Sequence, residues 1–272
     1  MINIKLSQKL KIKLMKKFLN KIIQNKIGKK IRVLINYKPM PIEISKKIES
    51  QSISDAFIWR TDNNFETIFK FTDILKFFYN LESNLHIAFF NKKNVNIKNL
   101  KITNIQKNNE IIVNKDFLNG IEDYGTFYIF HKPTSYLKNE KKLILSNRCY
   151  VGFSKNKSNP SFVHGNTLVK SSDLNSNKVY SDIVQTSPFF YQNYYIQNDF
   201  SFFDKTEICI CNPTSKKILF FVNKERYELE GLNITIIKLE KSQKLINIKS
   251  KCMFLRPIIF NFKKNFFDVY HA

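Results

Sequence analysis

The stretch FETIFKF, residues 65–71, shows the pattern that decides the fold. Phe65, Phe69 and Phe71 fall on one face of a two-residue alternation, and Glu66 and Lys70 fall on the other. Because successive side chains of a β-strand point to opposite faces, this order predicts a strand with one aromatic, buried face.

Short runs of the same kind recur along the chain, and clusters of Asn, Lys, Asp and Gly separate them. No long helical pattern lies between them, so we predict a mainly β protein with antiparallel sheets. The earlier runs are AFIWR (56–60), LHIAFF (85–90), LKITNI (100–105), EIIVN (110–114), GTFYIFH (125–131), CYVGF (149–153) and SFVHG (161–165). The later runs include FFYQNYYIQ (189–197), EICICN (207–212), KILFFVN (217–223) and NITIIKLE (233–240).

A stretch rich in Ser and Asn at residues 170–182 divides the two series of runs. This composition is typical of a linker or a long surface loop. We therefore predict an antiparallel sandwich architecture with two tandem β-sandwich units. Residues 31–170 would form the first sandwich, residues 171–185 the linker and residues 186–272 the second sandwich.

The first 30 residues differ from the rest, because their apolar residues recur at steps of three and four. Residues 7–30 predict an amphipathic helix, with Ser7 able to cap its start and Gly28 able to end it. Residues 1–35 carry ten Lys, one Arg and no acidic residue, hence a charge of +11. Three roles are open for residues 1–30: packing on a sheet or a second copy, binding an anionic membrane surface, or binding RNA phosphates.

The whole chain has a net charge of +23, which favours a nucleic-acid partner. Only five of its 45 basic residues are Arg, however, while Lys, Asn, Ile and Phe are abundant together. Arg makes the bidentate contacts that suit phosphates and bases, so this balance fits the bias of an AT-rich genome better than selection for nucleic-acid binding. A basic RNA-binding component of a ribonucleoprotein, such as an organellar ribosome, is the alternative.

The four cysteines have no zinc-binding spacing, since Cys209 and Cys211 lie two residues apart and Cys149 and Cys252 are isolated. We expect free, buried thiols in a reducing compartment. The sequence has neither a signal-peptide pattern nor a run of about 18 apolar residues. We therefore expect a cytoplasmic location, with peripheral attachment to the inner membrane as a variant of it.

The segment DAFIWRTDNNFET, residues 55–67, holds the only Trp of the chain. Trp59 lies beside Arg60 and shortly before Asp62, and such groups bind sugars, because aromatic faces stack on C–H groups while polar side chains bond hydroxyls. A second aromatic segment, residues 187–199, adds Tyr194 and its neighbours, some of which must point outward. The alternative for both segments is ordinary sandwich core.

The segment NRCYVGFSKNKSNPSFVHGN, residues 147–166, predicts a hairpin with a long polar loop. Arg148, His164 and Asn166 are the polar residues that we expect at a ligand site there. His131 and His164 also end strands and, beside an acidic residue, would form a metal site of two histidines and one carboxylate. The simpler interpretation is that each His bonds a loop carbonyl. The sequence contains no catalytic motif, and we expect no cofactor.

The segments SDAFIWRTDNNFETIFKFTD, GTFYIFHK, and SNRCYVGF followed by PSFVHGN resemble uncharacterised bacterial all-β proteins found near surface-polysaccharide genes. The resemblance covers roughly residues 50–170 and implies a glycan-related context. The function expected from it is a non-catalytic or accessory protein that binds a glycan or a glycan-assembly partner. A metal-dependent enzyme that uses His131 and His164 is a further alternative.

Overall fold

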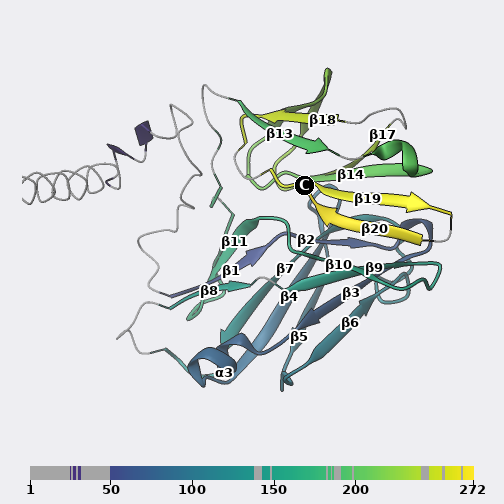
Figure 1. Cartoon of the computed structure of the whole chain (residues 1–272). Coiled ribbons are helices and arrows are strands. Elements are labelled where there is room, and N and C mark those ends of the chain that lie inside the picture. Colours follow the sequence, from purple (N-terminus) through teal and green to yellow (C-terminus); the bar gives the residue numbers. More distant parts are fainter. Residues whose placement is uncertain are drawn as a thin grey trace, which may run out of the picture.

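The protein is mainly β, as its alternating runs predict (Figure 1). The computed structural model describes residues 50–272 except 138–142, 148, 182, 185, 187–190, 198, 240–244, 253–254 and 265, together with residues 25, 27, 28, 30 and 31. The predicted amphipathic helix of residues 7–30 therefore lies almost wholly outside the described residues. No helix in the described part of the chain is long and apolar enough to cross a membrane.

Residues 50–180 form three four-stranded sheets, which we call the N-terminal sheets. The first has the order β2 (Phe57–Arg60), β7 (Tyr124–Pro133), β4 (Ser83–Asn91), β5 (Asn96–Ile102). The second has the order β10 (Ser161–His164), β9 (Tyr150–Lys155), β3 (Phe65–Phe71), β6 (Asn109–Val113). The third has the order β12 (Val179–Tyr180), β11 (Leu168–Asp173), β1 (Gln51–Asp55), β8 (Ile144–Asn147), and its β1–β8 pair is parallel.

Residues 192–271 form two further four-stranded sheets. The outer sheet has the order β13 (Gln192–Gln197), β18 (Leu245–Ser250), β15 (Ile218–Val222), β16 (Glu225–Leu229). The central sheet has the order β17 (Ile234–Leu239), β14 (Lys205–Cys211), β19 (Ile258–Lys263), β20 (Phe266–His271). In the described part of the chain, three short helical elements join the strands: η1 (Asp62–Asn64), α3 (Ile74–Tyr79) and η2 (Phe200–Phe202).

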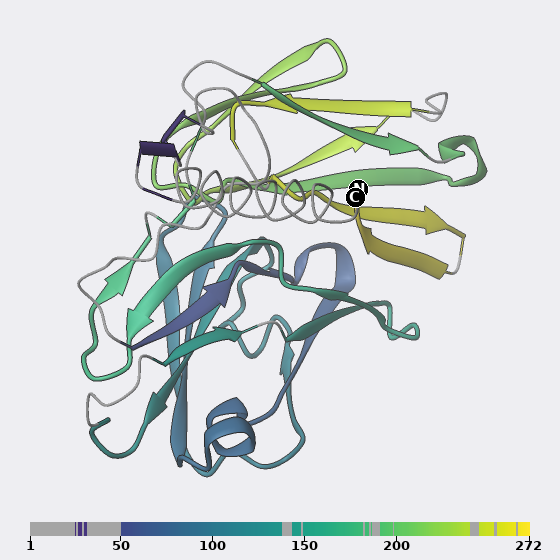
Figure 2. The ribbon, with the colours of Figure 1, turned by 60° about the vertical axis from the view of Figure 1, so that its left-hand side comes forward.

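The inner strands β14 and β19 of the central sheet are buried on both faces, because their side chains alternate between two cores. Ile208 and Ile210 face the outer sheet and pack with residues such as Phe220. Cys209 and Cys211 face the other way and belong to one core with Phe57 and other residues of the N-terminal sheets. In both ribbon views the strands of the central sheet lie between the outer sheet and the N-terminal sheets (Figures 1 and 2).

The predicted division into two tandem β-sandwich units is wrong. The described strands form five small sheets, and the central sheet completes the core of the N-terminal sheets as well as that of the outer sheet. Residues 168–173, at the predicted start of the linker, form strand β11 and pair with β1. Composition misled the prediction here, because β11 buries the serines Ser171 and Ser172 instead of apolar side chains, while its backbone pairs with β1 and β12.

Strand β7 shows how polar side chains replace a missing strand. Strand β4 pairs along one edge of β7, but on the other edge β2 covers only residues 124–127. Beyond that point the backbone N–H groups of Ile129 and His131 donate to the hydroxyls of Ser54 and Ser52, at 2.9 and 3.1 Å. These serines stand in for a strand, since a buried N–H group needs an acceptor.

Asparagine makes many of the turns in a chain that has only six glycines. Among the described residues other than glycine, eight of the eleven with positive φ are Asn. Asn tolerates the left-handed region better than other side chains that carry a Cβ. Asn80 is one of them: with a φ of 53° it ends helix α3.

Candidate functional site

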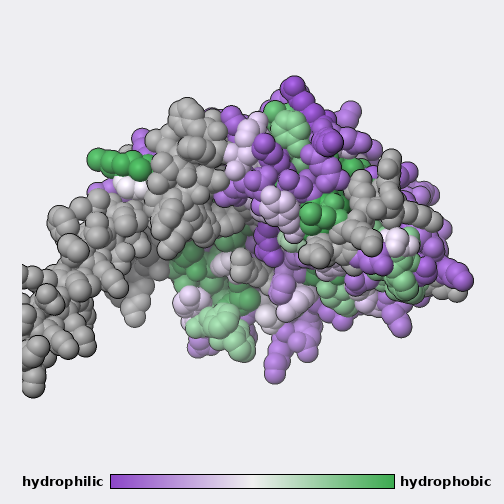
Figure 3. Space-filling view, turned by 45° about the horizontal axis from the view of Figure 1, so that its top comes forward, coloured by the Kyte–Doolittle hydropathy of each residue, from purple (hydrophilic) through white to green (hydrophobic). Residues whose placement is uncertain are grey.

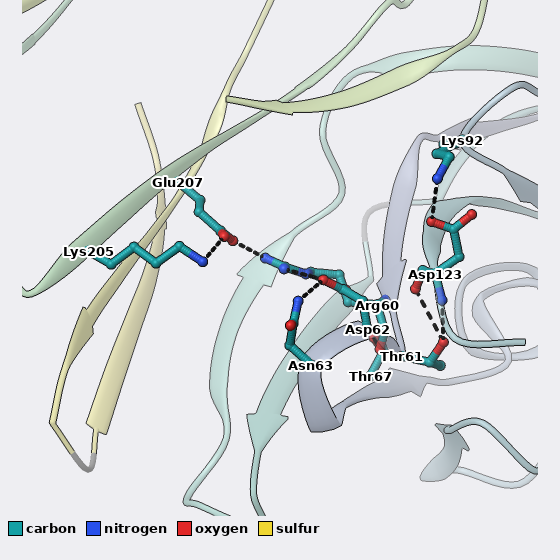
Figure 4. Close-up of polar contacts among 9 residues, drawn as sticks. All are labelled: Arg60, Thr61, Asp62, Asn63, Thr67, Lys92, Asp123, Lys205 and Glu207. Carbon is teal, nitrogen blue, oxygen red and sulfur yellow. Dashed lines mark hydrogen bonds and ion pairs between the residues drawn. The ribbon is translucent and has the colours of Figure 1, made fainter. Parts of the chain in front are cut away.

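Arg60 lies at the centre of a buried polar network that joins the N-terminal sheets to the central sheet (Figure 4). Its Nε and Nη2 atoms donate to the two carboxylate oxygens of Asp62, at 2.9 and 2.8 Å. Its Nη1 atom donates to Oε2 of Glu207 at 2.7 Å, and Lys205 contacts the other oxygen of that carboxylate. The guanidinium thus holds one carboxylate from each side of the interface.

Aromatic rings enclose the same guanidinium. Its central carbon lies 4.2 Å from the ring centroid of Phe65 and 4.8 Å from that of Phe260, so both rings make cation–π contacts with it. Burial alone would raise the pKa of Glu207, but the charge of Arg60 and the hydrogen bonds from Lys205 and Arg60 lower it on balance. The pKa of Asp62 is lowered in the same way: burial opposes the shift, and the hydrogen bonds and charge of Arg60 outweigh it.

The predicted sugar-binding pair Trp59 and Arg60 presents no surface to a ligand. Trp59 is 0 % exposed and Arg60 is 1 % exposed. The indole Nε1 donates to the carbonyl of Phe90 at 2.9 Å, and its ring lies against Gly125, where a Cβ would be only 2.8 Å from it. These residues hold sheets together, and of the three predicted in this segment only Asp62 keeps part of its side chain at the surface.

The predicted site at the end of the 147–166 hairpin lies at the seam between β10 and β20. His164 is exposed, and its ring lies 4.2 Å from that of Tyr150. The carbonyl of His164 is 3.0 Å from Nε2 of His271, whose pKa burial lowers to about 4. Asn166 is buried, and its backbone N–H donates to Ala56. Arg148 lies outside the described residues.

The structure does not bring His131 and His164 to shared partners. His131 is fully buried, and its Nδ1 atom lies 3.2 Å from the hydroxyl of Ser83 and 3.8 Å from Asp73. Burial lowers the pKa of His131 to about 4, against the attraction of Asp73, so this histidine is neutral near pH 7. No group of three or more His, Cys, Asp or Glu side chains arranged to hold a metal occurs among the residues that the structure describes.

Tyr194 points inward, whereas its neighbour Tyr195 points outward. The hydroxyl of Tyr194 donates to Gln192 and accepts from the backbone N–H of Leu255, and its ring packs against the core of the outer sheet. Tyr195 is 66 % exposed. The sequence alternation that predicts one outward tyrosine on this strand leaves open which of the two it is.

Tyr195 belongs to a mixed aromatic and polar surface on the outer face of the outer sheet, which we call the platform. One row of paired residues crosses all four strands of this sheet, and Tyr195 stands beside the row, opposite Asn247. The row consists of Asn193, Lys249, Phe221 and Arg226. Figure 3, which brings the top of Figure 1 forward, shows a largely hydrophilic surface with hydrophobic patches between the polar groups.

Charges on the platform are sparse and partly paired. Arg226 contacts Glu228 at 2.7 Å, and Glu228 is also paired with Lys217 at 2.7 Å. Lys249 forms no ion pair with a described residue, and its ammonium lies 4.8 Å from the ring centroid of Tyr191. The platform therefore offers aromatic faces, amides and an available cation on a rigid sheet, which are the groups that hold hydroxylated or anionic ligands.

No family model matches the chain, and a search of curated proteins found no match.

Proposed function

We propose that this protein is a non-catalytic binding protein for a weakly acidic glycan, which it holds on the platform. The observation that carries the proposal is the row Asn193, Lys249, Phe221 and Arg226 with Tyr195 beside it. An exposed tyrosine ring stacks on the C–H face of a sugar, the amides exchange hydrogen bonds with hydroxyls, and Lys249 meets a carboxylate or sulfate. A glycan is also the ligand class that we expect from the sequence.

The distribution of charge favours a glycan over a nucleic acid as the ligand. A nucleic acid carries one phosphate per nucleotide and is usually met by many unpaired cations. Glu228 neutralises Arg226 on the platform and adds a carboxylate that would repel phosphates. The platform offers one available lysine among aromatic and amide groups. A glycan with an occasional acidic sugar fits this arrangement better than a nucleic acid does.

A glycan array that includes acidic bacterial polysaccharides tests the proposal directly. The full chain should bind acidic glycans, and Tyr195→Ala should weaken the binding by about tenfold, the effect of losing one stacking ring. Lys249→Met should weaken binding to acidic glycans more than to neutral ones. Failure of the full chain to bind any glycan, or full binding by Tyr195→Ala, would show that the platform is not the site.

Two matched measurements make this test specific. Tyr150→Ala removes another exposed aromatic side chain, which stacks on His164 at the seam, and should leave glycan binding unchanged. Single-stranded RNA should bind weakly and be released at ~0.2 M salt, because contacts with phosphates are lost as salt rises. Tight RNA binding at that salt concentration, weakened by Tyr195→Ala, would instead favour the ribonucleoprotein alternative.

We further propose that the protein acts in a reducing compartment, in the cytoplasm or at the inner face of the membrane. No disulfide joins its four cysteines, and burial raises the pKa of each of them. Thiols of this kind are common in reducing compartments. Fractionation of cells that express the tagged full chain tests the location, and recovery from the periplasm or medium would contradict it.

A further inference from the structure

Helix α3 exposes three consecutive aromatic side chains, which we call the aromatic tip. Phe77 is 71 % exposed, Phe78 is 68 % exposed and Tyr79 is 47 % exposed. The rings touch one another, with centroids 4.9 Å apart for Phe77 and Phe78 and 6.5 Å apart for Phe78 and Tyr79. Soluble proteins rarely group large apolar side chains on the surface unless the patch meets a partner.

The helix that carries the aromatic tip is held firmly. Asp73 caps its start by accepting from the backbone N–H of Lys76 at 3.0 Å, and Asn80 ends it in the left-handed conformation. Leu75 is fully buried with Leu143 and other leucines. The exposure of the three rings is therefore a feature of the folded helix and not of a frayed end.

A further exposed aromatic residue lies at the same end of the molecule. Tyr136 is 71 % exposed, and its neighbour Leu137 packs on the same cluster as Leu75. The backbone N–H of Thr134 donates to Glu82, which ties this segment to the chain that follows α3. Figures 1 and 2 both show α3 at the end of the molecule opposite the outer sheet.

The size of the patch and the charge of the chain indicate what covers it. An aromatic side chain buries at most about 150–250 Å², so three of them supply a few hundred Å². A stable protein interface needs about 800 Å² on each partner, whereas a bilayer surface is bound through a few aromatic side chains together with positive charge. The chain carries a net charge of +23, which favours an anionic bilayer as the partner.

We propose that the aromatic tip inserts into the headgroup region of an anionic lipid bilayer. Phe77 and Phe78 enter the boundary between headgroups and acyl chains, and Tyr79 keeps its hydroxyl among the headgroups. The net positive charge of the chain favours an anionic lipid surface. The proposal is independent of glycan binding, because the platform lies at the opposite end of the molecule.

The test uses the full chain with Phe78→Trp as a reporter of insertion. The only native Trp, Trp59, is 0 % exposed and gives a constant background. Vesicles of phosphatidylcholine and phosphatidylglycerol should shift the emission of the new Trp to shorter wavelength, and brominated acyl chains should quench it. Vesicles of phosphatidylcholine alone should have little effect. Phe202→Trp, at another exposed Phe on η2, is the matched control and should show neither change.

Co-sedimentation with the same anionic vesicles gives the second readout. The double variant Phe77→Ser, Phe78→Ser should partition about tenfold less than the wild type, because two apolar side chains are lost from the membrane surface. Tyr195→Ala should bind vesicles like the wild type, which separates this proposal from the glycan proposal.

Three outcomes would overturn the proposal. The first is an unchanged emission of Phe78→Trp in anionic vesicles, and the second is full co-sedimentation of the double serine variant. The third is a blue shift that needs no vesicles and follows protein concentration together with a doubled mass, since that would make a second copy of the chain the occupant of the aromatic tip.

Discussion

The guanidinium of Arg60 binds the carboxylate of Asp62, two residues away in the sequence, and that of Glu207, 147 residues away. Its three hydrogen bonds use the planar fork of the group, which a lysine ammonium lacks. The chain has 45 basic residues, of which only five are Arg. One of these five is Arg60, whose guanidinium binds two carboxylates at once. Position, not abundance, makes this residue important.

Arg60→Met should destabilise the fold by about 3–5 kcal/mol, because it leaves the buried carboxylate of Glu207 without its main partner. Arg60→Lys should recover only part of this loss. Urea unfolding at pH 7 measures the free energy of unfolding of each variant.

The matched control is Lys70→Met, which breaks an exposed ion pair with Glu110. It should change the free energy of unfolding by less than about 1 kcal/mol. Equal effects of Arg60→Met and Lys70→Met would show that the buried network adds nothing to stability. Arg60→Met combined with Glu207→Gln should be more stable than Arg60→Met alone, since the uncompensated charge is then removed.

His131 should make stability depend on pH between about 6.5 and 4. Its pKa is about 4 in the folded chain against an ordinary 6.5, so within this window the unfolded chain binds a proton that the folded chain does not. Stability is therefore complete above pH 6.5 and falls as the pH is lowered towards 4. Chemical unfolding at several pH values should show a shallower slope for His131→Gln than for the wild type.

His271 provides an internal comparison for this slope. Burial lowers its pKa to about 4 as well, so His271→Gln should reduce the slope in the same direction. The double variant should lose more of the slope than either single variant. An identical slope in wild type and His131→Gln would contradict the burial of a neutral His131.

At the scale of the element, strand alternation predicted most strands but not their orientation. The run FETIFKF forms β3, with Phe65, Phe69 and Phe71 buried and Lys70 exposed, as predicted. In β13 the adjacent Tyr194 and Tyr195 make both orientations of the strand consistent with one buried and one exposed tyrosine. The hydrogen bond from Leu255 to the hydroxyl of Tyr194 shows that Tyr194 is the one that faces the core. A slip of one residue reverses the faces of a strand, so the exposed aromatic residue was missed by one position.

The burial of Trp59 and Arg60 depends on contacts with distant strands, which no local sequence pattern shows. Trp59 and Arg60 lie beside polar residues in the sequence, which predicts a ligand-binding surface. The partners that bury them, Phe90, Gly125 and Glu207, come from other strands. Local sequence showed which groups are present, but not that tertiary pairing would use them internally.

The edge of β7 at which Ser52 and Ser54 accept backbone hydrogen bonds leads to a prediction about stability. Ser54→Ala removes the acceptor for the N–H of Ile129 and should cost about 1–3 kcal/mol, the penalty for an unsatisfied buried group. Ser135→Ala, at an exposed position, should change stability by less than about 0.5 kcal/mol. Urea unfolding compares the two, and equal values would mean that water or another group satisfies Ile129.

At the scale of the whole molecule, the shared central sheet makes the two halves of the chain interdependent. The core that contains Phe57 also contains Cys209, Ile258 and Phe260 from the central sheet. The sequence shows two series of strands, but alternation does not show that both faces of β14 are buried. A strand that is covered on both sides simply reads as a continuous apolar run.

The full chain should therefore unfold in one cooperative transition. Trp59 fluorescence and far-ultraviolet circular dichroism should give coincident urea curves, although these signals report different parts of the chain. Residues 1–185 produced alone should bind a hydrophobic dye and lack a cooperative transition, because Phe65 and Phe153 lose the rings of Phe260 and its neighbours. Two separate transitions in the full chain would indicate that each half folds independently.

The burial of β14 on both faces has an evolutionary consequence. Six consecutive residues of this strand, Thr206–Cys211, are buried, so that almost any substitution meets a packed core on one side or the other. Substitutions that leave the fold intact must then fall elsewhere, for example at the exposed Lys224 in the turn between β15 and β16. In a library of random variants selected only for folding, β14 would be the strand that keeps its residues, and the abundant lysines of the surface would be the most readily exchanged.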